Sequence, residues 1–480
     1  MKPIMTLFSL LLLNQMVLAQ PTVTLTEELI KEQVETAAPN TLAIEASFLA
    51  VDLQRQAFED GFDLTLNGSS SYTRTSEKSF STQMPVTSPT KAYKLGVVKP
   101  LDSGMSIGVN TFSEQITNSL VKNGTKTGFG IEFSMDLYKN FLGRLTKAQR
   151  NLLQGSTKRA GLEKKIQNKA FYQSLRKVYW SLVANSEQRK ISESLLNLAL
   201  RQMKDAKKRY KNKIADIGEV ARYESQVADR RAGIISLDYQ KELLNQNIKT
   251  LLPELSDKNI VLGSYSVENT AKQLFKCTAK IQKFIEPPMH YTYYDEVLSS
   301  LQDEYSHQRK ITDSYSNVSV EFTSEMQRMG KAPGYSNSWD KFSEEGRNAY
   351  SAGVQFVIPL GGSHKKSQKL QQVLEQKRYI SQKEEIVGKV NSYHTQVIRN
   401  IFLLQKVMAQ EKINSSKLEI SLKETTKKYN QARLSVRDLI QDQNAYSSSK
   451  LLQIQSQLTI ITTLLDYFSV YTEIPCEMNN

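Results

Sequence analysis

Hydrophobic and polar residues alternate in two short segments that match each other. Residues 130–137 read Gly-Ile-Glu-Phe-Ser-Met-Asp-Leu, and residues 353–360 read Gly-Val-Gln-Phe-Val-Ile-Pro-Leu. Alternation of this kind is typical of β-strands with one apolar face. A glycine follows each segment, Gly143 in the first case and the pair Gly361 and Gly362 in the second, and a basic helix start comes next. These glycines are predicted to form the bend from strand to helix.

Long stretches with helical periodicity follow both strands. No proline occurs in residues 101–252 or 360–474, and a helix interior tolerates proline poorly. Apolar residues recur at spacings of three and four, for example in residues 191–200, which predicts amphipathic helices. A helix over residues 144–213 would be about 105 Å long.

The helical parts repeat as well. Residues 209–210 precede residues 217–220 as residues 428–429 precede residues 436–439, at an offset of 219 that the bend glycines Gly143 and Gly362 share. A period this long indicates two duplicated halves rather than a solenoid.

Further β-like sequence precedes each matched strand. Residues 62–66 and 318–322 alternate, and a candidate hairpin spans residues 93–98 and 105–112, joined by a turn at residues 100–104. Residues 330–346 read as a polar loop. The pattern leaves open whether each chain supplies four or six strands.

The first 19 residues read as a signal peptide. Lys2 is followed by a short apolar run and by small or modest residues before a cut at Gln20. The mature chain is therefore expected outside the cytoplasm, and nucleic acid is not expected as a partner for its positive charge. No later stretch has 18 uninterrupted apolar residues, so no transmembrane helix is predicted, whereas a β-barrel stays compatible with the low hydropathy.

Composition narrows the chemistry. Two cysteines exclude a disulfide-stapled scaffold and a four-cysteine zinc site. The four histidines lack ligand spacing, and no nucleophile–base–acid arrangement is visible, so neither an enzyme nor a metal or other cofactor is predicted. The net charge is +14, concentrated in helical stretches such as residues 204–213 and 423–428. It fits a solvated helix face, with a basic lining or a partner-binding surface as the alternative.

Together these features resemble the TolC-type outer-membrane efflux proteins. The resemblance rests on residues 25–28 and 38–40 near the N-terminus, on residues 356–362, on residues 429–438, and on the two strand–glycine–helix units. It implies a mixed α+β membrane protein that forms a homotrimer. Each of its two duplicated halves gives strands to one shared outer-membrane β-barrel, with twelve or eighteen strands in total, and long helices to a periplasmic α-helical barrel.

The resemblance also implies a function. It is that of the channel-tunnel of a tripartite export system in a Gram-negative-type outer membrane, with a periplasmic adaptor, an inner-membrane transporter and outer-membrane lipid as partners. The exported substrate, the pump and the resting state stay open. The alternative is a periplasmic or secreted coiled-coil scaffold, which leaves the alternating strands unexplained.

The hairpin turns would form the periplasmic tip of such a channel. In the second half the residues that match the family's turn motif are Tyr429, Ser435, Val436, Asp438 and Leu439, with Ala432 where the family has glycine. Asp216 and Glu219 hold the corresponding turn of the first half. Asp438 would form an acidic ring in a trimer, or would simply be a carboxylate at a helix start.

Cys277 and Cys476 follow the two helical halves and are a candidate disulfide, with two buried thiols as the alternative.

The predicted layout of the whole chain is a signal peptide at 1–19, an N-terminal helix at 20–60, first-half strands at 61–138, a first long hairpin at 139–253, connecting helices at 254–316, second-half strands at 317–362, a second long hairpin at 363–473 and a tail at 474–480.

Overall fold

A computed structural model describes residues 21–471, apart from positions 37, 80, 82, 119, 264, 282–288, 290, 291, 315–317, 359, 361, 362 and 432. The chain divides into two compact units. A helical unit comprises the described residues of Met1–Ala46, Lys164–Tyr293 and Gly388–Asn480, and a sheet unit comprises those of Ser47–Glu163 and Tyr294–Val387.

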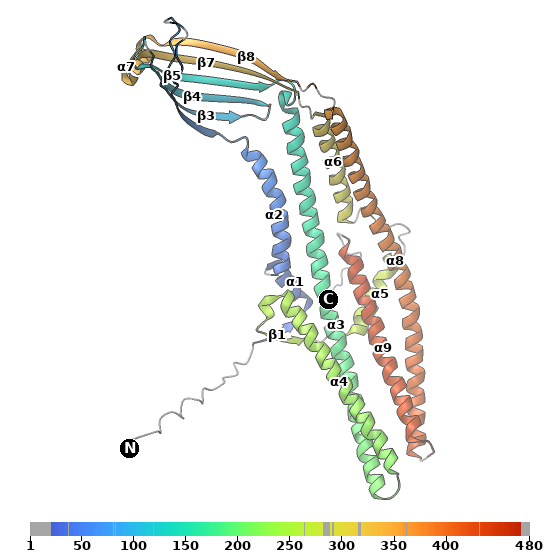
Figure 1. The fold of residues 1–480 in the computed structure, drawn as a ribbon. Helices are drawn as coiled ribbons and strands as arrows, with labels where there is room; N and C mark the ends of the chain where they lie inside the picture. The colour runs from blue at the N-terminus through green and yellow to red at the C-terminus, as the bar shows by residue number, and fades with distance from the viewer. Residues whose placement is uncertain are drawn as a thin grey trace, which may run out of the picture. The chain divides into compact units, whose positions relative to one another are not determined.

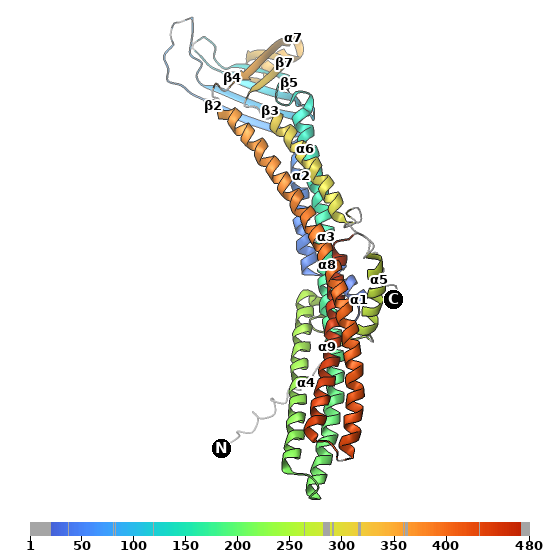
Figure 2. The ribbon, with the colours of Figure 1, turned by 90° about the vertical axis from the view of Figure 1, so that its right-hand side faces the viewer.

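Two long helical hairpins dominate the helical unit, where the end of α3 lies beside α4 and the end of α8 beside α9 (Figures 1 and 2). Both α3 and α8 have 68 residues, and α4 and α9 have 35 and 34. The bounds of the elements that lie wholly or partly in this unit are β1 Thr22–Leu25, α1 Glu27–Thr36, α2 Pro39–Asp60, α3 Arg144–Lys211, α4 Ile217–Leu251, η2 Pro253–Leu255, β6 Asn259–Leu262, α5 Val267–Ile281, α8 Ser363–Asn430 and α9 Val436–Ser469.

The N-terminal segment differs from the single helix predicted for residues 20–60. Thr22–Leu25 forms strand β1, which pairs in parallel with β6. The Thr26 hydroxyl then accepts from the Leu29 N–H at 3.1 Å at the start of α1. A second helix begins at Pro39, because proline fits the first turn of a helix but not its interior.

The core of the helical unit is aromatic and aliphatic. Tyr179 and Trp180 of α3 and Tyr467 and Phe468 of α9 are almost fully buried. Around them pack aliphatic side chains from α1, α4, α5 and α8. Burial of apolar surface on this scale is what holds such long helices in place, since helix propensity alone contributes little.

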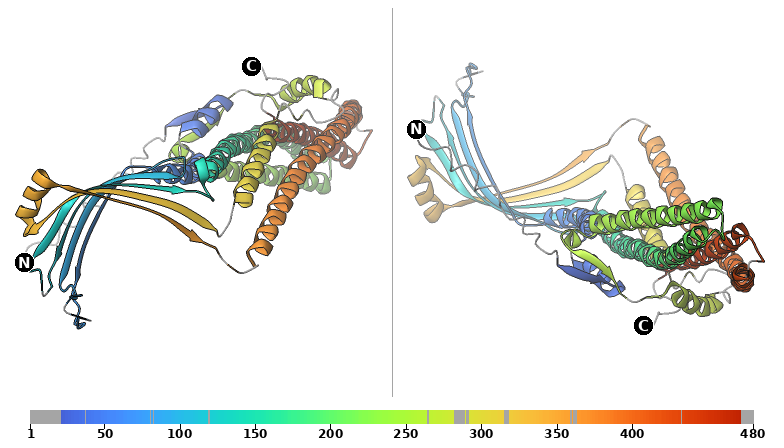
Figure 3. Two further views of the ribbon diagram at one scale, coloured as in Figure 1. Left: turned by 90° about the horizontal axis from the view of Figure 1, so that it is seen from above. Right: turned by 90° about the horizontal axis from the view of Figure 1, so that it is seen from below.

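The sheet unit contains one six-stranded antiparallel sheet in the order β2-β3-β4-β5-β7-β8 (Figures 1 and 3). The candidate hairpin predicted at residues 93–112 is present as β3 and β4, within this same sheet. The bounds of the elements in this unit are β2 Thr65–Thr73, β3 Thr90–Pro100, β4 Met105–Ile116, β5 Gly124–Asp136, η1 Phe141–Gly143, α6 Tyr293–Ser314, β7 Ser319–Pro333, α7 Tyr335–Glu345 and β8 Arg347–Val357, with the end of α2 and the beginnings of α3 and α8.

The two faces of this sheet differ in chemistry. The register places Ile131 between Val109 and Met326, and all three side chains are exposed. The opposite face carries Glu132, which accepts from the Asn110 amide at 2.7 Å and also pairs with Lys94. The first face is called the apolar face below. Its exposed apolar side chains include Leu66, Tyr93, Leu95, Ile107, Val109, Phe129, Ile131, Met326, Tyr350, Val354 and Phe356.

Residues 330–346, predicted as a polar loop, contain the helix α7 instead. The buried Ser338 hydroxyl attaches α7 to β5 and β7, because its one proton is shared between the carbonyls of Thr125 and Gly330 and its oxygen accepts from the Thr127 hydroxyl. Gly330 permits this close approach, because a Cβ there would lie 2.2 Å from the Ser338 carbonyl oxygen.

Within the described part of the chain, no helix is both long and apolar enough to cross a lipid bilayer.

Candidate functional site

The first hairpin turn joins α3 to α4 through a strained residue. Lys213 has a positive φ of 62°. Its N–H donates to the Tyr210 carbonyl at 2.9 Å, and the next N–H, of Ile214, donates to the Arg209 carbonyl at 2.9 Å. This is the Schellman arrangement, in which glycine normally occupies the left-handed position. A lysine there costs about 1 kcal/mol in backbone strain.

Asp216 and Glu219, both predicted tip residues, start α4. The Asp216 carboxylate accepts from the Glu219 N–H at 2.6 Å and so caps the helix. The Glu219 side chain does not complete the cap, and points to other partners.

Ser435 and Asp438 have the same relation at the start of α9. The Ser435 hydroxyl accepts from the Asp438 N–H at 3.3 Å and donates to the Asp438 carboxylate at 2.6 Å. Asp438 is exposed and lies in the first turn of α9, where the helix dipole favours a carboxylate. The acidic ring that the sequence suggested stays a prediction about an assembly.

Glu219 links the two hairpins. Its Oε1 accepts from the Tyr429 hydroxyl at 2.7 Å and from Nη1 of Arg209 at 3.0 Å. The same Arg209 nitrogen lies 2.9 Å from the Tyr429 oxygen, and the guanidinium lies 5.6 Å from the centre of the Tyr429 ring. Arg209 and Glu219 belong to the first hairpin and Tyr429 to the second, so these three residues, called the tip triad below, join the hairpins.

A small apolar cluster supports the tip triad. Val220 and Val436 are buried together with Ala206 and Tyr223, and Tyr429 packs against them. Leu439 is also buried. Of the predicted tip residues, Val436 and Leu439 are thus core residues, whereas Asp216, Ser435 and Asp438 are exposed.

Burial also sets the protonation of the two tyrosines. It raises the pKa of Tyr223 and that of Tyr429 above the ordinary value for a phenol. The Tyr429 hydroxyl therefore keeps its proton near neutral pH and serves as a donor to Glu219. A second, buried polar contact also joins the two hairpins. The side-chain amide of Gln226 in α4 donates to the side-chain oxygen of Gln443 in α9 at 3.0 Å.

The predicted bend at Gly143 lies between β5 and α3. Gly143 has a φ of +75°, and a Cβ there would lie 2.0 Å from the Asp102 carbonyl oxygen. The Asn140 carboxamide oxygen accepts from the N–H groups of Leu145 and Thr146, both at 3.0 Å, and fixes the first turn of α3. Arg150 then holds Asp102 and Glu59 in two ion pairs.

Several other predicted residues lie outside the part of the chain that the structure describes. Gly361, Gly362, Ala432 and Cys476 lie outside the described residues, as does the side chain of Cys277, whose backbone lies in α5. The second bend and the candidate disulfide therefore stay predictions.

Sequence reasoning missed Arg209 as a partner of Glu219. The signal was an acidic residue at the third position of α4, ten residues after a basic residue at the end of α3. It also missed α7, whose signal was Tyr335, Ser338, Trp339 and Phe342 at spacings of three and four between two glycines.

Solved structures of outer-membrane channels match the chain over nearly its full length. The outer membrane protein VceC of Vibrio cholerae matches with a TM-score of 0.67 at 13% identity, over 93% of this chain and 97% of that chain. The fold is that of the outer-membrane channels. The CmeC outer membrane channel of Campylobacter jejuni matches with a TM-score of 0.62 at 10% identity, over 94% and 90% of the two chains. The open state of the MtrE outer membrane channel of Neisseria gonorrhoeae gives a TM-score of 0.57 at 12% identity, over 92% and 88%.

The fold shared with these channels is the one that the resemblance to TolC-type proteins implied. No protein-family model matches the sequence, and no curated protein sequence matches it.

Proposed function

We propose that three copies of this chain form an outer-membrane export channel. The single observation that carries the proposal is the exposed apolar face of the six-stranded sheet, in a chain with the fold of outer-membrane channels. Exposed apolar surface this extensive is rare on a soluble monomer. A lipid environment would cover it.

The edges of the sheet support an assembly. Within the described residues, β2 pairs only with β3 and β8 only with β7. An open edge cannot lie in a bilayer, because its backbone groups would lack hydrogen-bond partners. Pairing of β2 of one copy with β8 of the next removes both edges. Three copies of six strands would give an eighteen-stranded barrel, the larger of the two counts considered from the sequence.

The helices carry unburied apolar side chains that a neighbouring copy would cover. Ile235, Tyr239 and Leu243 lie four residues apart on α4, and all three are exposed. Such a stripe is the pattern of a helix packed on one face. A periplasmic helical barrel would bury it.

The tip triad suggests how the channel opens. While Glu219 holds both Arg209 and Tyr429, the two hairpins of one chain stay together. Loss of these contacts would let the hairpin ends separate and widen the path. We propose that a periplasmic adaptor and an inner-membrane transporter drive this change, as in the export systems that the resemblance implies. No chemical step by the protein itself is part of the proposal.

Fractionation and single-channel recording test the proposal. If the chain forms a channel, we expect the protein in the outer-membrane fraction as a trimer, and the purified protein should give stepwise conductance in a planar bilayer. A monomer in the soluble periplasmic fraction with no channel activity would contradict it and favour the scaffold alternative. Block by multivalent cations that Asp438→Ala weakens would support the acidic ring, and block unchanged by Asp438→Ala would remove the ring while leaving the channel.

A further inference from the structure

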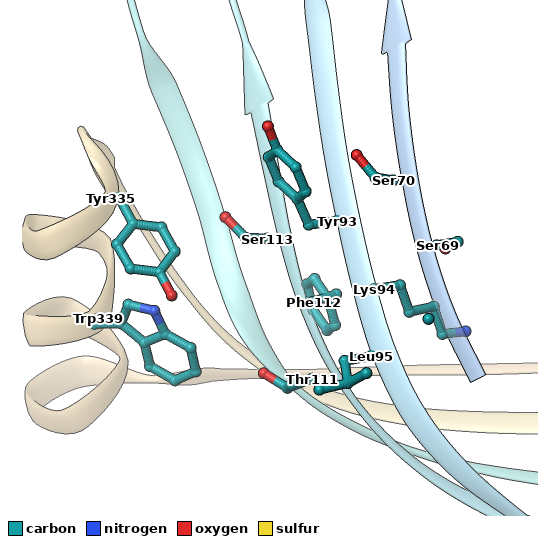
Figure 4. Close-up of a pocket in the computed structure, with 11 residues that line it drawn as sticks. Ser69, Ser70, Tyr93, Lys94, Leu95, Thr111, Phe112, Ser113, Tyr335 and Trp339 are labelled. Carbon is teal, nitrogen blue, oxygen red and sulfur yellow. The ribbon is translucent and has the colours of Figure 1, made fainter. Parts of the chain in front are cut away.

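A groove lies between α7 and strands β2, β3 and β4 (Figure 4). Its volume is about 420 Å³. Tyr335 and Trp339 of α7 form one wall and face the sheet, where Tyr93, Leu95 and Thr111 form the floor. Gly68 of β2 also lines it, and a Cβ at Gly68 would lie 3.5 Å from the Leu95 side chain. The groove thus has an aromatic wall and apolar side chains at its base, and polar residues line the rest of it, among them Ser69, Ser70, Lys94 and Ser113.

The wall of the groove is fixed in place. Trp339 and Phe342 both lie 5.5 Å from Phe129 of β5, measured between ring centres. The Arg328 guanidinium lies 5.8 Å from the centre of the Phe342 ring. Together with the hydrogen bonds of the Ser338 hydroxyl, these contacts hold the aromatic side of α7 against the sheet. The groove is a built feature of the sheet unit.

The groove opens on the apolar face. Thr111 and Phe129 are paired residues of β4 and β5, so the floor and the support of α7 lie on the same side of the sheet. The groove also lies toward the end that carries the β2–β3 and β4–β5 connections, away from the end at which α2 stops and α3 begins. In the proposed channel that end is the outer one.

A charged, an aromatic and an aliphatic residue occupy alternate positions along β3. Lys91, Tyr93 and Leu95 point to the same face, because alternate residues of a strand share a face, and Lys91 is nearest the outer end. Lys91 is exposed and takes part in no ion pair among the described residues. Its cross-strand partner Tyr72 is exposed as well. By comparison, Lys94 on the other face pairs with Glu132.

We propose that this groove binds an anionic acyl lipid of the outer leaflet, one whose phosphate no choline or amine neutralises. An acyl chain would lie over Leu95 and Gly68 against Trp339, and the phosphate would meet the ammonium of Lys91. Tyrosine and tryptophan, which have an apolar ring and one polar group, favour the interface between the hydrocarbon core and the lipid headgroups. A lysine near a membrane surface attracts anionic lipid. This inference rests on the proposed function, because it requires the apolar face to lie in the membrane.

Tryptophan quenching tests the groove in the full-length protein. The chain has two tryptophans, of which Trp180 is buried in the helical unit. The trimer would be placed in phosphatidylcholine vesicles that contain brominated phosphatidic acid or brominated phosphatidylcholine. The signal lost in Trp339→Phe defines the Trp339 component. We expect brominated phosphatidic acid to quench this component at a roughly fivefold lower mole fraction than brominated phosphatidylcholine.

Two variants and one matched control separate the site from the bulk membrane. Lys91→Gln should remove the preference for phosphatidic acid, and Gly68→Val, which fills the floor, should weaken quenching by phosphatidic acid. Lys99→Gln is the control, since Lys99 lies on the same strand and face at the other end and should keep the preference. Conductance of every variant checks that it still folds and assembles.

The outcomes distinguish the two proposals. Equal quenching by both lipids, unchanged in Lys91→Gln, would overturn the lipid site while leaving the channel intact. Quenching of Trp339 by aqueous iodide, with none from either brominated lipid, would place the apolar face outside the membrane and contradict both.

Discussion

The Tyr429 hydroxyl donates to Oε1 of Glu219 at 2.7 Å, although 210 positions separate the two residues. Arg209 contacts both of them. Glu219 therefore has one partner on its own hairpin and one on the other. This makes the carboxylate the joint at which the two hairpins of a chain are connected.

Removing the Glu219 charge should loosen the tip. In Glu219→Gln the ion pair with Arg209 is lost and the hydrogen bond from Tyr429 weakens, at a cost of about 1–3 kcal/mol. We expect a higher open probability in single-channel recordings, and a smaller rise for Tyr429→Phe. Because all three groups contact one another, the double variant should fall short of the sum of the single effects.

Glu224→Gln is the control for this pair of variants. Glu224 forms an ion pair with Lys207 at 2.7 Å, but both side chains are about half exposed, and such surface pairs contribute little. If the open probability rises as much in Glu224→Gln as in Glu219→Gln, this result would contradict the role of Glu219 in connecting the two hairpins.

The sequence predicted the parts of the fold that depend on local pattern. Absence of proline marked the long helices, and alternation marked the strands, including the β3–β4 hairpin. These signals are local, because helix and strand periodicity is fixed by the backbone itself. Asp216 and Ser435 were predicted only as turn residues, and the structure shows each of them capping the helix that follows its turn.

What the sequence could not predict depends on contacts between distant segments. The pairing of β1 with β6 joins Thr22 to Asn259, and the bond between Glu219 and Tyr429 crosses two hairpins. The helix α7 has only 11 residues, and a helix that short is stable through its contacts with β5 and β7 rather than through its own sequence. Neither alternation nor helical period carries that information.

The strain at Lys213 gives a stabilising prediction. Its φ of 62° suits glycine, so Lys213→Gly should stabilise the turn by about 1 kcal/mol. Hydrogen exchange of the neighbouring amides measures this, and protection should increase. Lys213→Ala removes the charge but keeps a Cβ, so it should give no such increase. Equal protection in both variants would assign the effect to charge and contradict the strain.

The bend at Gly143 gives the opposite prediction. In Gly143→Ala a Cβ would lie 2.0 Å from the Asp102 carbonyl oxygen at a φ of +75°. Both the clash and the backbone conformation disfavour the variant, by about 2–4 kcal/mol together. We expect poor trimer assembly in the membrane fraction. The matched variant Gly233→Ala, at a helical glycine with open space around it, should be stabilised by up to about 1 kcal/mol. Normal assembly of Gly143→Ala would contradict the role of the bend.

Glu187 makes stability depend on pH. Its carboxylate accepts from the Val267 N–H at 3.0 Å at the start of α5, and burial raises the pKa of Glu187 above its usual value of 4.5. As the pH rises through 4.5 the unfolded chain loses this proton first, so the stability of the fold decreases until the folded-state pKa is passed. The loss of stability caused by the buried Glu187 carboxylate is fully present at neutral pH.

Glu187→Gln keeps an acceptor for Val267 without a charge, and should raise the apparent Tm at pH 7 but not below pH 4. Glu193→Gln, on the same helix but in an exposed pair with Arg189, should show no such gain at neutral pH. A Tm difference between Glu187→Gln and the native chain that does not change with pH would contradict this assignment.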